Sequence, residues 1–143
     1  MKQAELSTWG ITILRVSVGI IFLMNGWVKL FVNGIAGTAG FFDSIGIPLA
    51  TAAAVVVSVL EFAGGAALIL GVGTRLVSPL LAVVMLTALF TVHIGNGFFV
   101  SNGGISHVFA LLAATLTLTL TGPGRLALAD LVTSRGAGTP EAA

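Results

Sequence analysis

The sequence predicts an all-α integral membrane protein, a four-helix bundle with both termini in the cytoplasm. Hydrophobic residues make up 57% of the chain and charged residues only 8%, whereas a soluble domain carries about 25% charged residues. A helix of about 20 apolar residues spans a bilayer. The apolar runs lie at about 8–30, 49–70, 76–94 and 105–121. We expect one domain, residues 1–131, followed by a disordered cytoplasmic tail, 132–143.

The first apolar run carries a polar stripe. Arg15, Gly19, Phe22, Gly26 and Lys29 follow one another at helical spacing and share one face. A charge at the bilayer centre costs about 2.5–3.5 kcal/mol on insertion scales, so this face is expected to contact protein. Its glycines would let another helix approach closely.

The segment 31–48 and the second run differ in composition. The segment is too rich in glycine for a spanning helix and too apolar for a free loop. We expect it to lie at the membrane interface or to re-enter the bilayer, and the sequence leaves both alternatives open. The second run has Glu61 near its middle, on one face with Ser58 and Gly65. Such small residues indicate a helix–helix contact.

The third and fourth runs are joined by a glycine-rich connection, 95–104. The fourth run ends in alternating Thr and Leu, which has the period of a strand. Threonine in membrane helices commonly bonds to its own backbone, so we predict a helix here. A short amphipathic piece then reaches Leu131.

Basic residues predict the orientation of the bundle. Four spans put both termini on one side, and an excess of Lys and Arg marks the cytoplasmic side. The cations expected there are Lys2, Arg75, Arg125 and Arg135. The net charge of +1 offers no basic surface for nucleic acid.

The polar side chains separate into two layers by their expected depth. Arg15 and Glu61 would lie in the inner half, about 6 Å apart along the helix axes. We predict an ion pair between them, either structural, fixing helix register, or functional, as a proton or anion site.

The outer layer contains more polar groups and predicts a ligand site. We assign Lys29 and His93 as catalytic residues, with Asp43 close by. The expected ligand-binding residues are Asn25, Asn96, His107, Phe42 and Phe98. A lysine and two histidines roofed by phenylalanines suit an aromatic head group with carbonyl oxygens, such as a quinone. The alternative is that these side chains reach for lipid head groups.

Other cofactors find little support in the sequence. Two histidines on neighbouring helices permit bis-His haem ligation, but the spacing of His93 and His107 is no haem signature. No metal site is predicted, since Asp43 is the only carboxylate near that depth. Cysteine is absent, which excludes disulfides, thiolate clusters and a thiol relay within this chain.

Five motifs, in order, resemble the DoxX family of small four-helix bacterial membrane proteins. They are LRVSVGIIFLMNGWVKL, FFDSIGIP, LEFAGGAALILGVGTR, VHIGNGFF and GPGRLALAD, between about Leu14 and Leu131. The resemblance implies a multi-pass protein of the bacterial cytoplasmic membrane with a link to redox and oxidative-stress functions. The family is similar to the DoxD subunit of a thiosulfate:quinone oxidoreductase, and some members associate with superoxide dismutase and a sulfurtransferase. Arg15, Lys29, Glu61 and His93 stand where members tend to carry those residue types.

The chain departs from that family pattern at two points. The run Gly-Gly-Ile-Ser-His, 103–107, lacks the acidic residue that often follows the glycine pair. The exit motif reads Ala-Leu-Ala-Asp instead of the common Ser-Leu-Asp. If that acid takes part in an outer-layer reaction, the enzymatic reading is weaker for this chain.

Three functions follow as hypotheses. The first is a membrane subunit of a redox system that binds a quinone-like molecule in the outer layer. The second is a scaffold that recruits a soluble redox enzyme to the bilayer. The third is a small anion or proton carrier using Arg15 and Glu61. Homo-oligomerisation is left open.

Overall fold

The computed structural model describes residues 2–131, and within them it is helical and has no strand. The main helices are α1 (Gln3–Trp27), α2 (Gly34–Ser44), α3 (Ala50–Leu70), α4 (Thr74–Ala88) and α5 (Ser106–Thr121). The short segments are the π-helices η1 (Val28–Val32) and η2 (Leu89–His93) and the 3-10 turns η3 (Ile94–Asn96) and η4 (Val100–Asn102). The predicted disordered tail, 132–143, lies outside the described residues.

Three of these helical stretches are long and apolar enough to cross a membrane. They are Gln3–Val32, Ala50–Leu70 and Thr74–Asn96, and α5 is a shorter apolar helix of 16 residues. The predictions of an all-helical fold and of membrane-spanning helices are therefore confirmed. The fourth span and the orientation of the termini stay predictions.

The Thr/Leu run forms a helix, as predicted. Thr115, Thr117, Thr119 and Thr121 each donate a hydrogen bond from the hydroxyl to the carbonyl four residues earlier. The polar groups of the run are thus satisfied within the helix, which is compatible with an apolar environment.

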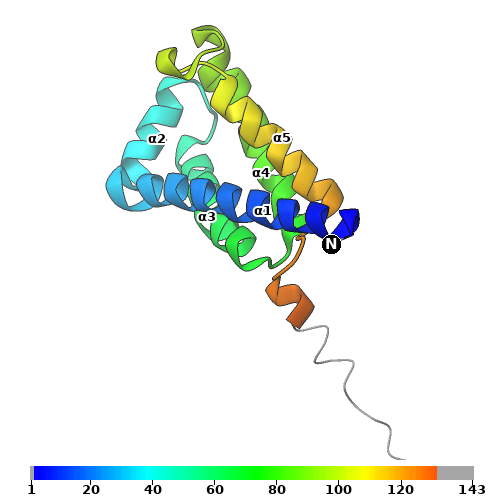
Figure 1. The fold of residues 1–143 in the computed structure, drawn as a ribbon. Helices are drawn as coiled ribbons and strands as arrows, with labels where there is room; N and C mark the ends of the chain where they lie inside the picture. The colour runs from blue at the N-terminus through cyan, green and yellow to red at the C-terminus, as the bar shows by residue number, and fades with distance from the viewer. Residues whose placement is uncertain (1, 132–143) are drawn as a thin grey trace, which may run out of the picture.

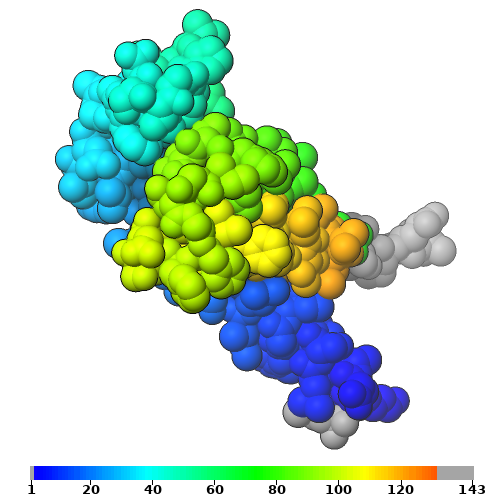
Figure 2. Space-filling view, turned by 90° about the horizontal axis from the view of Figure 1, so that it is seen from above, coloured from blue at the N-terminus to red at the C-terminus, as the bar shows by residue number. Residues whose placement is uncertain are grey.

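The helices form two antiparallel pairs. Figure 1 shows α1 beside α3, and α4 beside α5. Between the end of the α1–η1 stretch and the start of α3, the chain passes through α2. At that end α2 (cyan) lies beside the connection between α4 and α5 (yellow-green), which is also visible from above in Figure 2. The core between the pairs contains fully buried side chains: Phe22, Leu68, Leu81 and Leu118.

Glycines set how α1 meets α3. A Cβ atom at Gly26 would overlap the backbone of Phe62, and one at Gly65 would overlap the backbone of Leu23. The two backbones are therefore in direct contact, as expected from small residues on facing helix surfaces. This contact fixes which residues of α1 lie opposite which residues of α3.

The predicted Arg15–Glu61 ion pair is absent, and Arg15 instead binds the segment after α5. Its guanidinium donates hydrogen bonds to the carbonyls of Pro123, Arg125 and Leu126, the latter two at 3.2 Å. The physical reason is the α1–α3 register. Arg15 lies against Gly71, just past the end of α3, which is about 15 Å of helical rise from Glu61.

The segment 31–48 is more regular than expected. After η1, a turn at Gly34 with φ of +70° leads into α2, which packs on the start of α3. Ala39 and Phe42 of α2 and Ala54 of α3 form this second, smaller buried cluster.

Candidate functional site

A cavity of about 600 Å³ lies between the two helix pairs, below α2. Its volume is in the range typical of small-molecule sites. Most of its wall is apolar and comes from α3, α4 and α5. Its polar or aromatic wall residues include Asn25, Lys29, Phe41, Phe42, Glu61, Thr87, Thr91, His93 and His107.

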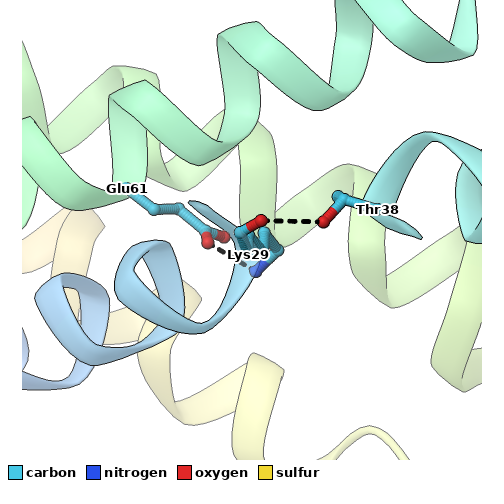
Figure 3. Close-up of polar contacts among 3 residues, drawn as sticks. All are labelled: Lys29, Thr38 and Glu61. Carbon is cyan, nitrogen blue, oxygen red and sulfur yellow. Dashed lines mark hydrogen bonds and ion pairs between the residues drawn. The ribbon is translucent and has the colours of Figure 1, made fainter. Parts of the chain in front are cut away.

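The charged part of the wall is an ion pair between Lys29 and Glu61. Lys29 Nζ lies 2.5 Å from Glu61 Oε2, and the side chains are 24% and 3% exposed respectively. Figure 3 shows the two side chains meeting between η1 and α3, with the hydroxyl of Thr38 donating to the Lys29 carbonyl at 3.2 Å. Pairing offsets the large cost of burying a lone carboxylate.

Two π-helical turns carry the residues predicted to be catalytic. Lys29 lies in η1 and His93 ends η2, each of which continues a long α-helix. A π turn inserts a residue into the helical repeat and redirects the side chains that follow, and such turns are frequent at functional sites. Here both turns direct a polar residue to the same cavity.

His93 is oriented by the connection between α4 and α5. Its Nδ1 atom lies 2.7 Å from the carbonyl of Gly103. Because a carbonyl only accepts hydrogen bonds, Nδ1 carries the proton, and in the neutral ring Nε2 is left as an acceptor. The amide of Asn96 donates to the same Gly103 carbonyl and to Val92, at 3.3 Å each. Asn96 thus supports the connection.

Two further polar residues of the wall keep their hydrogen-bonding capacity. The side chains of Asn25 and His107 have no hydrogen-bond partner among residues 2–131. Both are available to a ligand in the cavity. Phe42 is buried and forms part of the roof with Phe41, the ring centroids lying 6.2 Å apart.

The structure brings together most, but not all, of the predicted site. Lys29, His93, Asn25, His107 and Phe42 line one cavity. Asn96 and Phe98 do not: Asn96 supports the loop, and the exposed Phe98 packs edge-on against Phe99 at 5.5 Å. Asp43 lines a separate open hollow between α2 and the start of α3.

Sequence reasoning missed Glu61 as a member of this site. It assigned Glu61 to a deeper layer than Lys29, by counting residues from the expected helix ends. The glycine positions alone do not give the register, because Gly26 packs against Phe62 and not against a glycine, and this contact lies within one helical turn of the Lys29–Glu61 pair. Among the described residues no group of three His, Asp or Glu could hold a metal ion.

The family model of DoxX matches residues 10–94. The chain belongs to the DoxX family. The matched residues of this DoxX chain contain Lys29, Glu61 and His93, whereas His107 and the segment bound by Arg15 lie beyond them.

Several relatives match nearly the whole chain. "Putative oxidoreductase CatD" of Bacillus subtilis is 37% identical over 86% of this chain and 87% of that protein. "Inner membrane protein YqjF" of Escherichia coli is 30% identical over 94% of this chain and 99% of that protein. "Inner membrane protein YphA" of the same organism is 30% identical over 81% and 85%. No solved structure matches this DoxX chain.

Proposed function

We propose that this DoxX protein binds a lipid-soluble, carbonyl-bearing molecule of the quinone class, as a membrane subunit of a redox system. One observation carries the proposal: Lys29, His93, Asn25 and His107 face a single cavity whose remaining wall is mostly apolar. Such a cavity suits a flat apolar ring, and its few polar groups would fix the orientation of the ring oxygens.

The side chains have complementary roles toward such a ring. The Lys29 ammonium would polarise one carbonyl oxygen, while Glu61 holds the ammonium at the wall. His93 offers Nε2 as a proton acceptor, or as a donor once the ring is protonated, while Nδ1 stays bonded to Gly103. Asn25 and His107 can donate hydrogen bonds to the second oxygen.

Electrons for quinone chemistry would come from a partner. The chain has no cysteine and so no thiol that could carry them. The name of the relative "Putative oxidoreductase CatD" supports a redox role, and we propose a soluble redox enzyme as the electron donor. If the purified protein bound no quinone but retained such an enzyme, the scaffold function would replace this one.

We also propose that α5 is the fourth span and that both ends of residues 2–131 face the cytoplasm of an inner membrane. The names of the YqjF and YphA relatives support the location. Thr12 of α1 accepts a hydrogen bond from the Arg125 amide at 2.7 Å, which supports a common side for the two ends.

Labelling of K2C, S101C and D130C in this cysteine-free chain tests the topology. K2C and D130C should react from the cytoplasm and S101C from outside, whereas K2C and D130C on opposite sides would refute it.

The ligand hypothesis is tested by equilibrium binding of quinones in nanodiscs. We expect Lys29→Ala and His93→Ala each to weaken binding by about tenfold to a hundredfold, the effect of losing a charged or well-oriented hydrogen bond. Lys2→Ala is the matched control for the lysine, since Lys2 is exposed and remote from the cavity. Equal affinity for the unmodified protein and both cavity variants would refute the proposal.

A further inference from the structure

We infer that the ligand is membrane-borne and amphiphilic, with its head in the cavity and an apolar chain leaving sideways between α3 and α4 into the bilayer. The inference rests on the proposed function and specifies the class of molecule that the same site takes. The exposure and the polarity of the cavity wall both change between its inner end and its rim, and these changes indicate the type of ligand.

The two helices that bound this opening diverge from a tight turn. At the turn, residues 71–73, and shortly beyond it, they are in contact: a Cβ atom at Gly64 would lie 3.1 Å from Val77 and 3.5 Å from Leu81. Further from the turn, residues of both helices, such as Val57 of α3 and Val84 of α4, line the cavity. The space between α3 and α4 is therefore a wedge that widens away from the turn, as the helices are drawn in Figure 1.

Exposure changes across the cavity wall. At the inner end, Glu61, Met85 and Leu111 are buried. At the rim, Val56 of α3 is 63% exposed and Val83 of α4 is 61% exposed, although both line the cavity. Both residues lie within helices that are long and apolar enough to span the membrane. The opening therefore faces hydrocarbon and not water.

The α4 side of the rim is an apolar stripe. Leu80, Val83, Thr87 and Thr91 follow one another at helical spacing, and all line the cavity. The Thr87 hydroxyl donates to the Val83 carbonyl at 2.9 Å, and the Thr91 hydroxyl donates to the Thr87 carbonyl at 2.8 Å. Because neither hydroxyl needs a further partner, the stripe presents mainly methyl groups along about 17 Å of helix.

These features select one type of occupant. The charged groups, Lys29 and Glu61, are at the buried end, and the mainly apolar rim is at the end open to lipid. A molecule with a carbonyl-bearing ring and an isoprenoid chain matches this order. A compact water-soluble quinone would make no contact with the apolar rim. It would also not partition into the bilayer from which the opening is reached.

Substitutions at the rim test the inference in nanodiscs with two probes. The probes are a 1,4-naphthoquinone with an isoprenoid chain and 2-methyl-1,4-naphthoquinone without one, each at a fixed mole fraction. Val56→Trp and Val83→Trp narrow the opening. Val59→Trp and Leu86→Trp are the matched controls, because these exposed residues of α3 and α4 do not line the cavity.

We expect the unmodified protein to bind the chain-bearing probe at least tenfold more tightly than the short one. Each rim variant should lose at least tenfold in affinity for the chain-bearing probe, and the controls should lose less than twofold. If both probes bind with equal affinity and the rim variants bind them normally, the lateral opening is refuted while the quinone site stands. If neither probe binds the unmodified protein, the quinone site itself is refuted and the inference falls with it.

Discussion

Lys29 of η1 and Glu61 of α3 form an ion pair with a separation of 2.5 Å between Nζ and Oε2. This contact joins α1 to α3 at the buried end of the cavity, beside the glycine contacts that fix the helix register. It thereby links the packing of the bundle to the chemistry of the candidate site.

The first prediction concerns the stability of this pair. Glu61→Ala should lower the free energy of unfolding by about 1–3 kcal/mol, less than for a fully buried pair because Lys29 is partly exposed. Lys29→Met should also destabilise, and the double variant should lose less than the sum. Unfolding in mixed detergent micelles measures the cycle, with the exposed Glu5→Ala as control. If the loss in the free energy of unfolding of the double variant equalled the sum of the two single losses, the ion pair would not form.

The second prediction concerns the α1–α3 contact. Gly65→Ala should destabilise the protein by about 1–3 kcal/mol or more, because the new methyl group would overlap the backbone of Leu23. Gly10→Ala in the same bundle is the control, since a Cβ atom there has nothing within 4 Å. That control should be neutral or slightly stabilising, given the higher helix propensity of alanine. Thermal unfolding curves of equal midpoint for the two variants would contradict the packing.

These two regions also explain what the sequence could and could not predict. Helices, apolar faces and the glycine stripe follow from composition and periodicity, because each depends on residues close in the chain. The partner of Glu61 depends on the register of two helices, and α1 begins at Gln3, earlier than the expected residue 8. Counting residues from the helix ends assumed that α1 and α3 end at the same level, whereas Arg15 lies against Gly71, just past the end of α3. Lys29 and not Arg15 therefore reaches Glu61.

The two π turns, η1 and η2, could not be predicted from the sequence either. Spacing arguments assume 3.6 residues per turn throughout, and neither η1 nor η2 contains a proline or glycine that would mark a break. Lys29 and His93 were selected because both lie at polar ends of apolar runs, and both line the cavity. Asn96 was selected for the same reason and Phe98 as part of the aromatic roof, and neither residue lines the cavity.

The third prediction concerns the segment that follows α5. Arg15→Lys should loosen residues 122–127, because an ammonium group cannot make the forked contacts that the guanidinium makes with three carbonyls. Thr12→Val should act similarly by removing the acceptor of the Arg125 amide. Hydrogen exchange at that amide should rise by about tenfold or more in both variants. Unchanged exchange in both would show that the segment is held by other contacts.

The fourth prediction separates support of the loop from binding of the ligand. Asn96→Ala should speed hydrogen exchange in the connection 97–105, because it removes two hydrogen bonds, one of them to Gly103. It should change quinone affinity by less than about twofold, since Asn96 does not line the cavity. His93→Ala should affect both quantities. If Asn96→Ala lost as much quinone affinity as His93→Ala, Asn96 would have to be counted among the ligand-binding residues.

The most direct test of the quinone site is photoaffinity labelling with an azido-quinone in nanodiscs, followed by peptide mass spectrometry. The label should attach to the cavity-lining parts of α3, residues 53–61, and of α4 with η2, residues 83–93, and excess unlabelled quinone should prevent it. Labelling restricted to the connection 97–103, or labelling that excess quinone leaves unchanged, would contradict a quinone site in this cavity.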